Sequence, residues 1–113
     1  MAFILKQSDS YIWPVTVELP VDGGRFEKHS FDAEFKRLSQ SRIEEIMEDV
    51  VKGDAKDREV AAEILIGWRG VSDDNGDIPF SEKARNDLLN IPLVSASTIK
   101  AWMESLAGAK RKN

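Results

Sequence analysis

Acidic and amide side chains cluster around an Asn-Gly pair in the segment WRGVSDDNGDIPFSEKAR (68–85), between two stretches with helical periodicity. A helix–loop–helix calcium site needs oxygen ligands at loop positions 1, 3, 5, 7, 9 and 12, with Gly at position 6. With Gly76 at position 6, the segment supplies Asp73 at 3, Asn75 at 5 and Glu82 at 12. Position 1 is then Val71, whose apolar side chain cannot provide the carboxylate required there. The ligand set is incomplete, so the sequence predicts no metal site.

Turn formation explains the same residues better. Asn75-Gly76 favours a tight turn, and Asp side chains accept hydrogen bonds from backbone N–H groups close by. Pro79 would lie inside the calcium loop, and no second such loop occurs in the chain. Ser81 is suited to cap a helix N-terminus, with Glu82 favourable in the first turn. We therefore predict a turn over 73–77 and a helix that starts after Ser81.

The remaining residues give little support for catalysis. The chain has no Cys, which excludes disulfides, thiolate nucleophiles and Cys-based metal sites. His29 is the only His, and no nucleophile elbow or ordered triad spacing accompanies it. Asp22-Gly23-Gly24 lacks both the strand–loop–helix context and the Lys-Ser/Thr pair of a phosphate-binding loop. We expect neither an enzyme nor a bound cofactor.

The charge distribution argues against nucleic acid as a partner. Sixteen Lys and Arg face twenty Asp and Glu, a net charge of −4. Removing Lys110, Arg111 and Lys112 of the tail leaves 13 basic residues against 20 acidic ones, so the body stands at −7. Nucleic-acid binding needs a basic surface instead. No apolar run approaches the roughly 18 residues of a membrane span, so we expect a soluble, intracellular protein with no membrane partner.

The N-terminal third predicts a β-hairpin over 11–38, after a loose lead-in at 1–10. YIWPVTVELP (11–20) alternates apolar and polar residues, as a half-buried strand does. Pro14 has no N–H to donate, so this strand should lie at a sheet edge or begin after it. The VDGG segment at 21–24 suits the hairpin turn. In the return strand the apolar parity changes between Phe26 and Phe31, which predicts a bulge near 28–30.

The rest of the chain, 39–108, predicts about four helices. The first has a capping box of Ser41 and Glu44 and ends at Gly53. The second should start near 54–57 and run through Trp68, followed by a loop over 69–80. The helix after Ser81 should stop at Pro92, and the last should end at Gly108, before a basic tail at 109–113. The chain is thus expected to be one α+β domain, with the β-hairpin first and the helices after it.

Large aromatic side chains are frequent for so short a chain, with three Trp and five Phe. Most should be used in the core. Trp and Arg also anchor protein interfaces, and Trp68-Arg69 stands beside the turn segment. The composition therefore favours a protein-binding function.

The segment GWRGVSDDNGDIPFSEKARNDLLNIPLV (67–94) resembles the hallmark segment of tail assembly chaperones from long-tailed, lambda-like bacteriophages (siphoviruses). The residues that carry the resemblance are Gly67, Trp68, Gly76, Pro79, Phe80, Ser81, Glu82, Leu88, Leu89, Ile91 and Pro92. The upstream segment FDAEFKRLSQSRIEEI (31–46) is also similar to that family. Together the two segments cover about two fifths of the chain.

The resemblance implies a non-enzymatic role in phage tail assembly within the host cytoplasm. Such chaperones bind the tape-measure protein, help to recruit the major tail (tube) protein, and are not expected in the mature virion. The family often adds a longer product through a ribosomal frameshift, for which Gly108, Ala109 and Lys110 lie at a suitable place. As partner-binding residues we expect Trp68, Arg69 and Phe80, with Phe31 and Phe35 on the hairpin as a second candidate surface.

Other functions stay open at this point. A small inhibitor or antitoxin-like protein would also bind one partner tightly, and a minor structural virion protein would be found in purified particles. A homo-oligomer formed through the edge of the hairpin is a further alternative.

Overall fold

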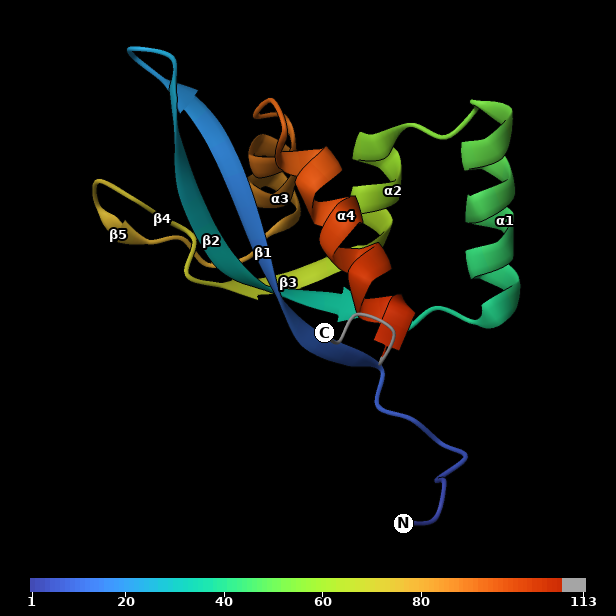
Figure 1. Cartoon of the computed structure of the whole chain (residues 1–113). Helices are drawn as coiled ribbons and strands as arrows, with labels where there is room; N and C mark the ends of the chain where they lie inside the picture. Colours follow the sequence, from blue (N-terminus) through green and yellow to red (C-terminus); the bar gives the residue numbers. More distant parts are fainter. Residues whose placement is uncertain (109–113) are drawn as a thin grey trace.

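The computed structural model describes residues 1–108. Its first elements form a long antiparallel hairpin of β1 (Ser10–Val21) and β2 (Arg25–Lys36). The turn between them places Gly23 and Gly24 at φ 84° and 74°, which glycine adopts without a steric penalty. The predicted β-hairpin is confirmed, and its tip extends beyond the helices (Figure 1).

β1 is an edge strand of a three-stranded sheet in the order β1-β2-β3, in which β3 spans Leu65–Arg69. The edge position tolerates the missing N–H of Pro14, as the sequence predicted.

The bulge expected near 28–30 is wrong. The β1–β2 register runs without a shift from Ser10↔Lys36 to Val21↔Arg25. Phe26 has the opposite parity to Phe31 because it lies on the outer face near the hairpin tip, where its side chain is 64% exposed. The register shift in β2 occurs instead between Glu34 and Phe35, where β2 pairs with β3.

Helix α1 (Gln40–Lys52) is capped two residues earlier than expected. The Ser39 hydroxyl accepts a hydrogen bond from the Arg42 amide at 3.1 Å, so Ser41 is not the cap and the predicted capping box is wrong. Two Ser residues flank the first helical position, and the sequence alone did not distinguish them. The predicted C-terminus is confirmed, because Gly53 adopts φ 80° as a left-handed cap.

The second helix is much shorter than predicted. α2 (Asp57–Ile64) ends where β3 begins, so Leu65 to Trp68 are strand and not helix. Leu65 and Gly67 are buried while Ile66 is exposed, which is a two-residue period. Gly67 also fits the sheet, because a Cβ there would meet the side chain of Glu34 on β2, with its Cβ only 3.2 Å away.

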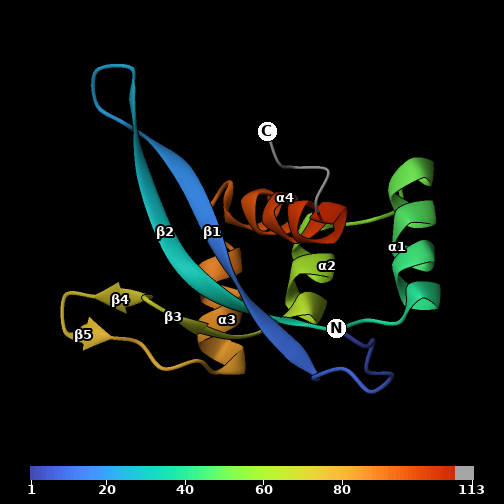
Figure 2. The same cartoon turned by 60° about the horizontal axis from the view of Figure 1, so that its bottom comes forward.

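The segment predicted as a loop over 69–80 contains a small hairpin of β4 (Ser72–Asp73) and β5 (Gly76–Asp77). It projects from the sheet beside α3 (Figures 1 and 2).

The last two helices are close to expectation. α3 (Glu82–Leu89) starts after Ser81, whose hydroxyl accepts from the Ala84 amide at 3.0 Å. α4 (Val94–Ala107) ends at Gly108. Within residues 1–108, no helix is long and apolar enough to cross a membrane.

The core lies between the inner face of the sheet and helices α2, α3 and α4 (Figure 2). α4 packs across β1 and against α2, and the Tyr11 and Ser105 hydroxyls join β1 to α4 at 2.8 Å. The large side chains buried most completely are Trp102, Phe35, Ile46, Ile64, Leu65 and Val15. The predicted α+β class, with the hairpin first and the helices after it, is confirmed.

α1 stands apart from the other helices in both views (Figures 1 and 2). The side chain of Ile46 is buried against the core. In addition, Arg42 makes a bidentate ion pair with Glu63 of α2, with Nε–Oε2 and Nη2–Oε1 distances of 2.8 and 2.7 Å. These contacts, with Ile43 and Met47 packing against the core, connect α1 to the rest of the fold.

We expect Glu63→Gln to weaken this connection in a pH-dependent way. The hydrogen bonds from Arg42 hold the pKa of the Glu63 carboxyl below its ordinary value of 4.5. A lowered folded-state pKa gives stability that is present above the unfolded pKa and is lost as the pH falls through the folded one. Glu63→Gln should therefore lower the free energy of unfolding by less than about 1 kcal/mol at pH 7, and by almost nothing below the folded pKa. Urea melts across pH measure this, with exposed Glu59→Gln on the same helix as the control. A pH-independent difference would contradict the assignment.

Candidate functional site

Trp68 organises the segment between β3 and α3. Its indole Nε1–H donates to the backbone carbonyl of Ile78 at 2.8 Å. Its ring meets Phe80 edge-to-face, with centroids 4.9 Å apart and planes at 76°. The Ile78 amide in turn donates to the Val71 carbonyl at 2.8 Å, which closes the base of the β4–β5 hairpin. These contacts fold residues 70–80 back onto the Trp68 ring.

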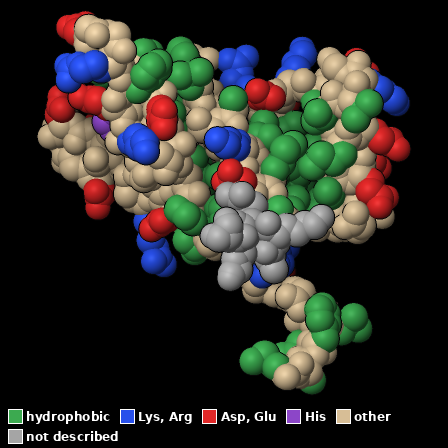
Figure 3. All heavy atoms as spheres, viewed as in Figure 1, with side chains coloured by type: hydrophobic (Ala, Val, Ile, Leu, Met, Phe, Trp, Pro, Cys, Tyr) green, Lys and Arg blue, Asp and Glu red, His purple; other side chains and the backbone are tan. Residues whose placement is uncertain are grey.

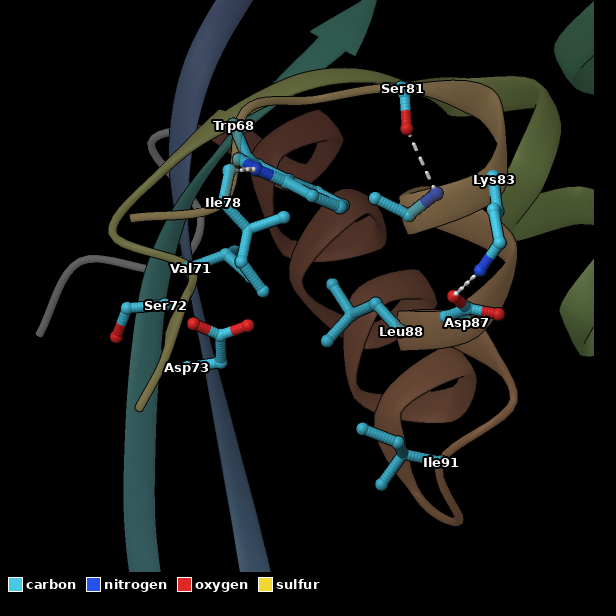
Figure 4. A pocket seen from close by; sticks show the side chains of 11 residues that line it. Trp68, Val71, Ser72, Asp73, Ile78, Ser81, Lys83, Asp87, Leu88 and Ile91 are labelled. Carbon is cyan, nitrogen blue, oxygen red and sulfur yellow. Dashed lines mark hydrogen bonds and ion pairs between the residues drawn. The ribbon is translucent and has the colours of Figure 1, made fainter. Parts of the chain in front are cut away.

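An apolar cleft of about 420 Å³ opens beside this ring (Figure 4). We call it the Trp68 cleft. One wall consists of Trp68, Val71 and Ile78, and the other consists of Ala84 and Leu88 of α3 with Ile91 just beyond it. In Figure 4 the side chains of Val71, Ile78 and Leu88 point toward one another across the opening.

The cleft continues toward the large hairpin. A neighbouring hollow of about 230 Å³ shares Val71, Ser72, Leu88 and Ile91 with it. This hollow extends to Val17 and Leu19 on the inner face of β1. The two hollows therefore adjoin one another between the sheet, the β4–β5 hairpin and α3.

Charged groups stand at the rim of the cleft. Lys83 Nζ lies 2.8 Å from Asp87 Oδ2, an i,i+4 ion pair on the exposed side of α3. The hydrogen bond that Lys83 donates to Asp87 raises the pKa of the Lys83 amine above its ordinary value. Asp73 stands on the opposite side (Figure 4). The lining is thus apolar, with a rim that contains two carboxylates and one neutralising amine.

The acidic turn is built as the sequence predicted. Asp73 Oδ1 accepts a hydrogen bond from the Asn75 amide at 2.8 Å, so its carboxylate stabilises the turn. Gly76 follows at φ 117°. Residues 1–108 contain no group of three or more His, Cys, Asp or Glu side chains arranged to hold a metal ion. His29 lies exposed on the large hairpin, with Nε2 3.4 Å from Glu27 Oε1.

The structure brings together only part of the predicted partner-binding set. Trp68 and Phe80 are in contact and half-buried, and Arg69 follows at the exposed end of β3. Phe31 and Phe35 instead belong to the core, with exposed fractions of 9% and 0%. Phe31 also lines the hollow of about 230 Å³ that adjoins the cleft, whereas Phe35 is fully buried. Gly108 caps α4, whereas Ala109 and Lys110 lie outside the described residues.

The α3 side of the cleft was missed by reasoning from the sequence. Ala84, Leu88 and Ile91 recur at i, i+4 and i+7, which is the spacing of one helix face. The sequence analysis included none of the three among the expected partner-binding residues, although Leu88 and Ile91 are among those that carry the family resemblance. An apolar stripe beside an acidic turn was the available signal. Only the placement of α3, through Arg85 Nη1 donating to the Ala62 carbonyl at 3.2 Å, turns the stripe into a wall.

Trp68→Phe should separate the hydrogen bond from the ring contact. The ring stays, but the carbonyl of Ile78 loses its side-chain donor, which costs about 1 kcal/mol for a partly buried group. We expect this loss in urea melts, together with faster hydrogen exchange of the Ile78 amide. The matched control is Trp13→Phe, because the Trp13 indole makes no hydrogen bond with residues 1–108. Equal losses in both variants would contradict a specific role for the indole N–H.

Comparison with protein-family models, curated proteins and solved structures finds no match for this chain.

Proposed function

We propose that this chain is a non-enzymatic tail assembly chaperone of a long-tailed bacteriophage, and that the Trp68 cleft receives a helix of the tape-measure protein. One observation carries the proposal. The segment that resembles the chaperone family, 67–92, is the same segment that forms both walls of the apolar cleft. The residues that carry the resemblance to the chaperone family therefore lie together in this chain, around one apolar surface.

The shape and chemistry of the cleft support a helical partner. Amphipathic helices bind in apolar grooves through side chains at i, i+3 or i+4, and i+7. Ala84 and Leu88 on α3, with Ile91 just beyond its end, offer matching positions. Ile91 is 44% exposed although it is apolar, as expected of a surface that a partner covers. The carboxylates of Asp73 and Asp87 would favour basic residues on the flanks of the partner helix.

The proposed role follows from what such a cleft does. A tape-measure protein presents long apolar helix faces that associate with one another in water. A chaperone that covers part of those faces keeps the protein dispersed until tail-tube subunits are recruited, and then leaves. The chain would act in the host cytoplasm and be missing from the finished virion.

Co-expression tests the proposal. The tape-measure protein encoded in the same genome is produced alone, with this chain, or with an unrelated acidic protein of similar size. The expected result is that only this chain increases the soluble fraction of tape-measure protein and co-purifies with it. No co-purification, or recovery of the chain in purified virions at stoichiometric amounts, would contradict the proposal.

A frameshift product is an independent expectation of the same proposal. The native coding DNA with its downstream region, tagged at the N-terminus, should yield a minor longer protein that diverges near residues 108–110. Intact-mass spectrometry of the tagged products measures this. A single product would weaken the family assignment without affecting the cleft.

A further inference from the structure

The segment before β1 leaves three large apolar side chains in water. Phe3, Ile4 and Leu5 are 85%, 69% and 93% exposed. Figure 3 shows this segment as a hydrophobic extension that projects away from the body of the molecule. We call residues 1–6 the N-terminal arm. Apolar side chains gathered in this way normally lie against another surface.

The root of the arm is fixed beside an apolar hollow. The Arg37 amide donates to the Asp9 carbonyl at 2.9 Å, and Arg37 Nε donates to Ser8 Oγ at 3.2 Å. The Arg37 guanidinium also lies over the ring of Tyr11, 4.8 Å from its centroid. These contacts hold the chain from Ser8 onward, and the next residue toward the N-terminus, Gln7, lines the hollow.

This hollow of about 250 Å³ lies between the open end of the sheet and helices α1 and α4. Its apolar lining comes from β1, the end of β2 and both helices, through Tyr11, Leu38, Ile43, Trp102 and Leu106. We call it the Trp102 hollow. A cavity of roughly 150 Å³ already accommodates a benzene-sized group. The Trp102 hollow is therefore large enough for one branched aliphatic side chain.

Leu5 is the arm residue placed to fill this hollow. Side chains two residues apart on an extended segment project to the same side, so Leu5 would follow Gln7 toward the hollow. Ile4 and Lys6 would project to the opposite side, toward water. Two extended residues span roughly 7 Å, so Leu5 can reach the hollow without movement of the chain after Gln7.

Only local contacts keep the arm away from the hollow. The chain bends at Leu5 and Lys6, and Gln7 Nε2 donates to the Ile4 carbonyl at 2.6 Å on the exposed side. Among residues 1–108, no other hydrogen bond and no ion pair involves residues 1–6. Straightening the arm therefore breaks one exposed hydrogen bond, which water can replace at little net cost.

The arm of the same chain is the best-placed occupant of the hollow. A segment tethered two residues away has a roughly millimolar effective concentration, far above that of a second copy in dilute solution. The other end of the chain has no large apolar side chain after Leu106, since it continues as Ala-Gly-Ala-Lys-Arg-Lys-Asn. Lys36 and Arg37 also line the hollow, where they disfavour a basic segment of that kind.

We propose that the N-terminal arm is a strap that closes over its own body, with Leu5 inserted in the Trp102 hollow and Lys6 left in water. Figure 1 shows the open state of this strap. Closing buries Leu5 against Trp102 and Leu106 of α4, so it ties the start of the chain to the last helix. The proposal does not rest on the proposed function, because no residue lines both the Trp102 hollow and the Trp68 cleft.

Urea unfolding of two adjacent variants tests the strap. Leu5 and Ile4 are both exposed in the open state, so an arm that stays open predicts no loss of stability in Leu5→Asp or Ile4→Asp. A closed arm buries Leu5 alone. We expect Leu5→Asp to raise the equilibrium constant of unfolding at least about fivefold, and Ile4→Asp to change it less than about twofold. An effect of Ile4→Asp as large as that of Leu5→Asp, or no effect of either, would overturn the proposal.

Methyl NMR of the unmodified chain identifies the occupant. Nuclear Overhauser contacts are expected from the Leu5 methyl groups to the methyl groups of Ile43 and Leu106. In a mixture of two differently labelled copies, isotope-filtered spectra separate contacts within one chain from contacts between chains. We expect the contacts within one chain, at an intensity per molecule that does not change on dilution. Contacts only between chains would assign the hollow to the arm of a second copy, and absence of both would leave the arm in water; either result would overturn the proposal.

Discussion

Trp102→Ala should lower the free energy of unfolding by about 3–5 kcal/mol, which is a large part of the stability of a domain of this size. Trp102 is only 1% exposed and is the largest fully buried side chain among the described residues. It projects from α4, the helix that packs on both β1 and α2. Truncation would leave a cavity where sheet and helices meet, and neighbouring elements can fill it only in part.

Urea unfolding followed by far-UV circular dichroism measures this effect. Trp13→Ala is the control, because it makes the same chemical change at a half-buried position on β1. We expect the control to lose clearly less stability than Trp102→Ala. Similar losses at both positions would contradict a core centred on α4.

Ile91→Asp should abolish binding of the tape-measure helix while the chain stays folded. Ile91 lines both the Trp68 cleft and the hollow that adjoins it. Its side chain is 44% exposed in the free chain, so a carboxylate there remains hydrated until a partner covers it. Burying that charge under an apolar helix without a counter-ion is strongly unfavourable. We expect the dissociation constant to rise at least about 100-fold, which is roughly 2.7 kcal/mol.

The control for this prediction is Leu106→Asp. Leu106 is also 44% exposed, but it lies on α4 in a separate hollow with Ile43 and Trp102, and not in the cleft. Binding of the tape-measure helix should be nearly unchanged in Leu106→Asp. If Leu106→Asp weakened binding and Ile91→Asp did not, the hollow beside Leu106 would be the partner site and the assignment of the Trp68 cleft would be wrong.

The sequence predicted turns and helix ends correctly where they depend on interactions between neighbouring residues. The Gly residues of the hairpin turn, the cap at Ser81, and the helix ends at Gly53 and Gly108 each follow from the backbone preferences of a few neighbouring residues. The edge position of β1 followed from Pro14 for the same reason.

The conversion of Leu65–Arg69 into a strand could not be read in this way. The run Ile64-Leu65-Ile66 is compatible with a buried helix and with a strand, because a short apolar run has no decisive period. Pairing of β3 with β2 selects the strand, and this pairing joins residues 30 to 37 positions apart in the chain. That interaction depends on tertiary packing, which overrides local propensity.

The sequence predicted one residue of the candidate site, Trp68, but not the shape of the cleft around it. Trp68 could be singled out from its type and its place beside a turn, and it does organise the segment around it. Burial of Phe31 and Phe35 agrees with the expectation that most large aromatic side chains enter the core, but which of them do so depends on which face of the hairpin the helices cover. For the same reason the α3 wall became visible only in the assembled fold.

Hydrogen-exchange mass spectrometry of the chain, alone and with the tape-measure protein, is the most direct measurement of the central claim that the Trp68 cleft receives a tape-measure helix. The account predicts slower amide exchange over residues 71–78 and 83–91 in the complex, with little change over α1 at 40–52. Amide protection confined to α1 would contradict the account. Failure of the chain and the tape-measure protein to form a complex would also contradict it.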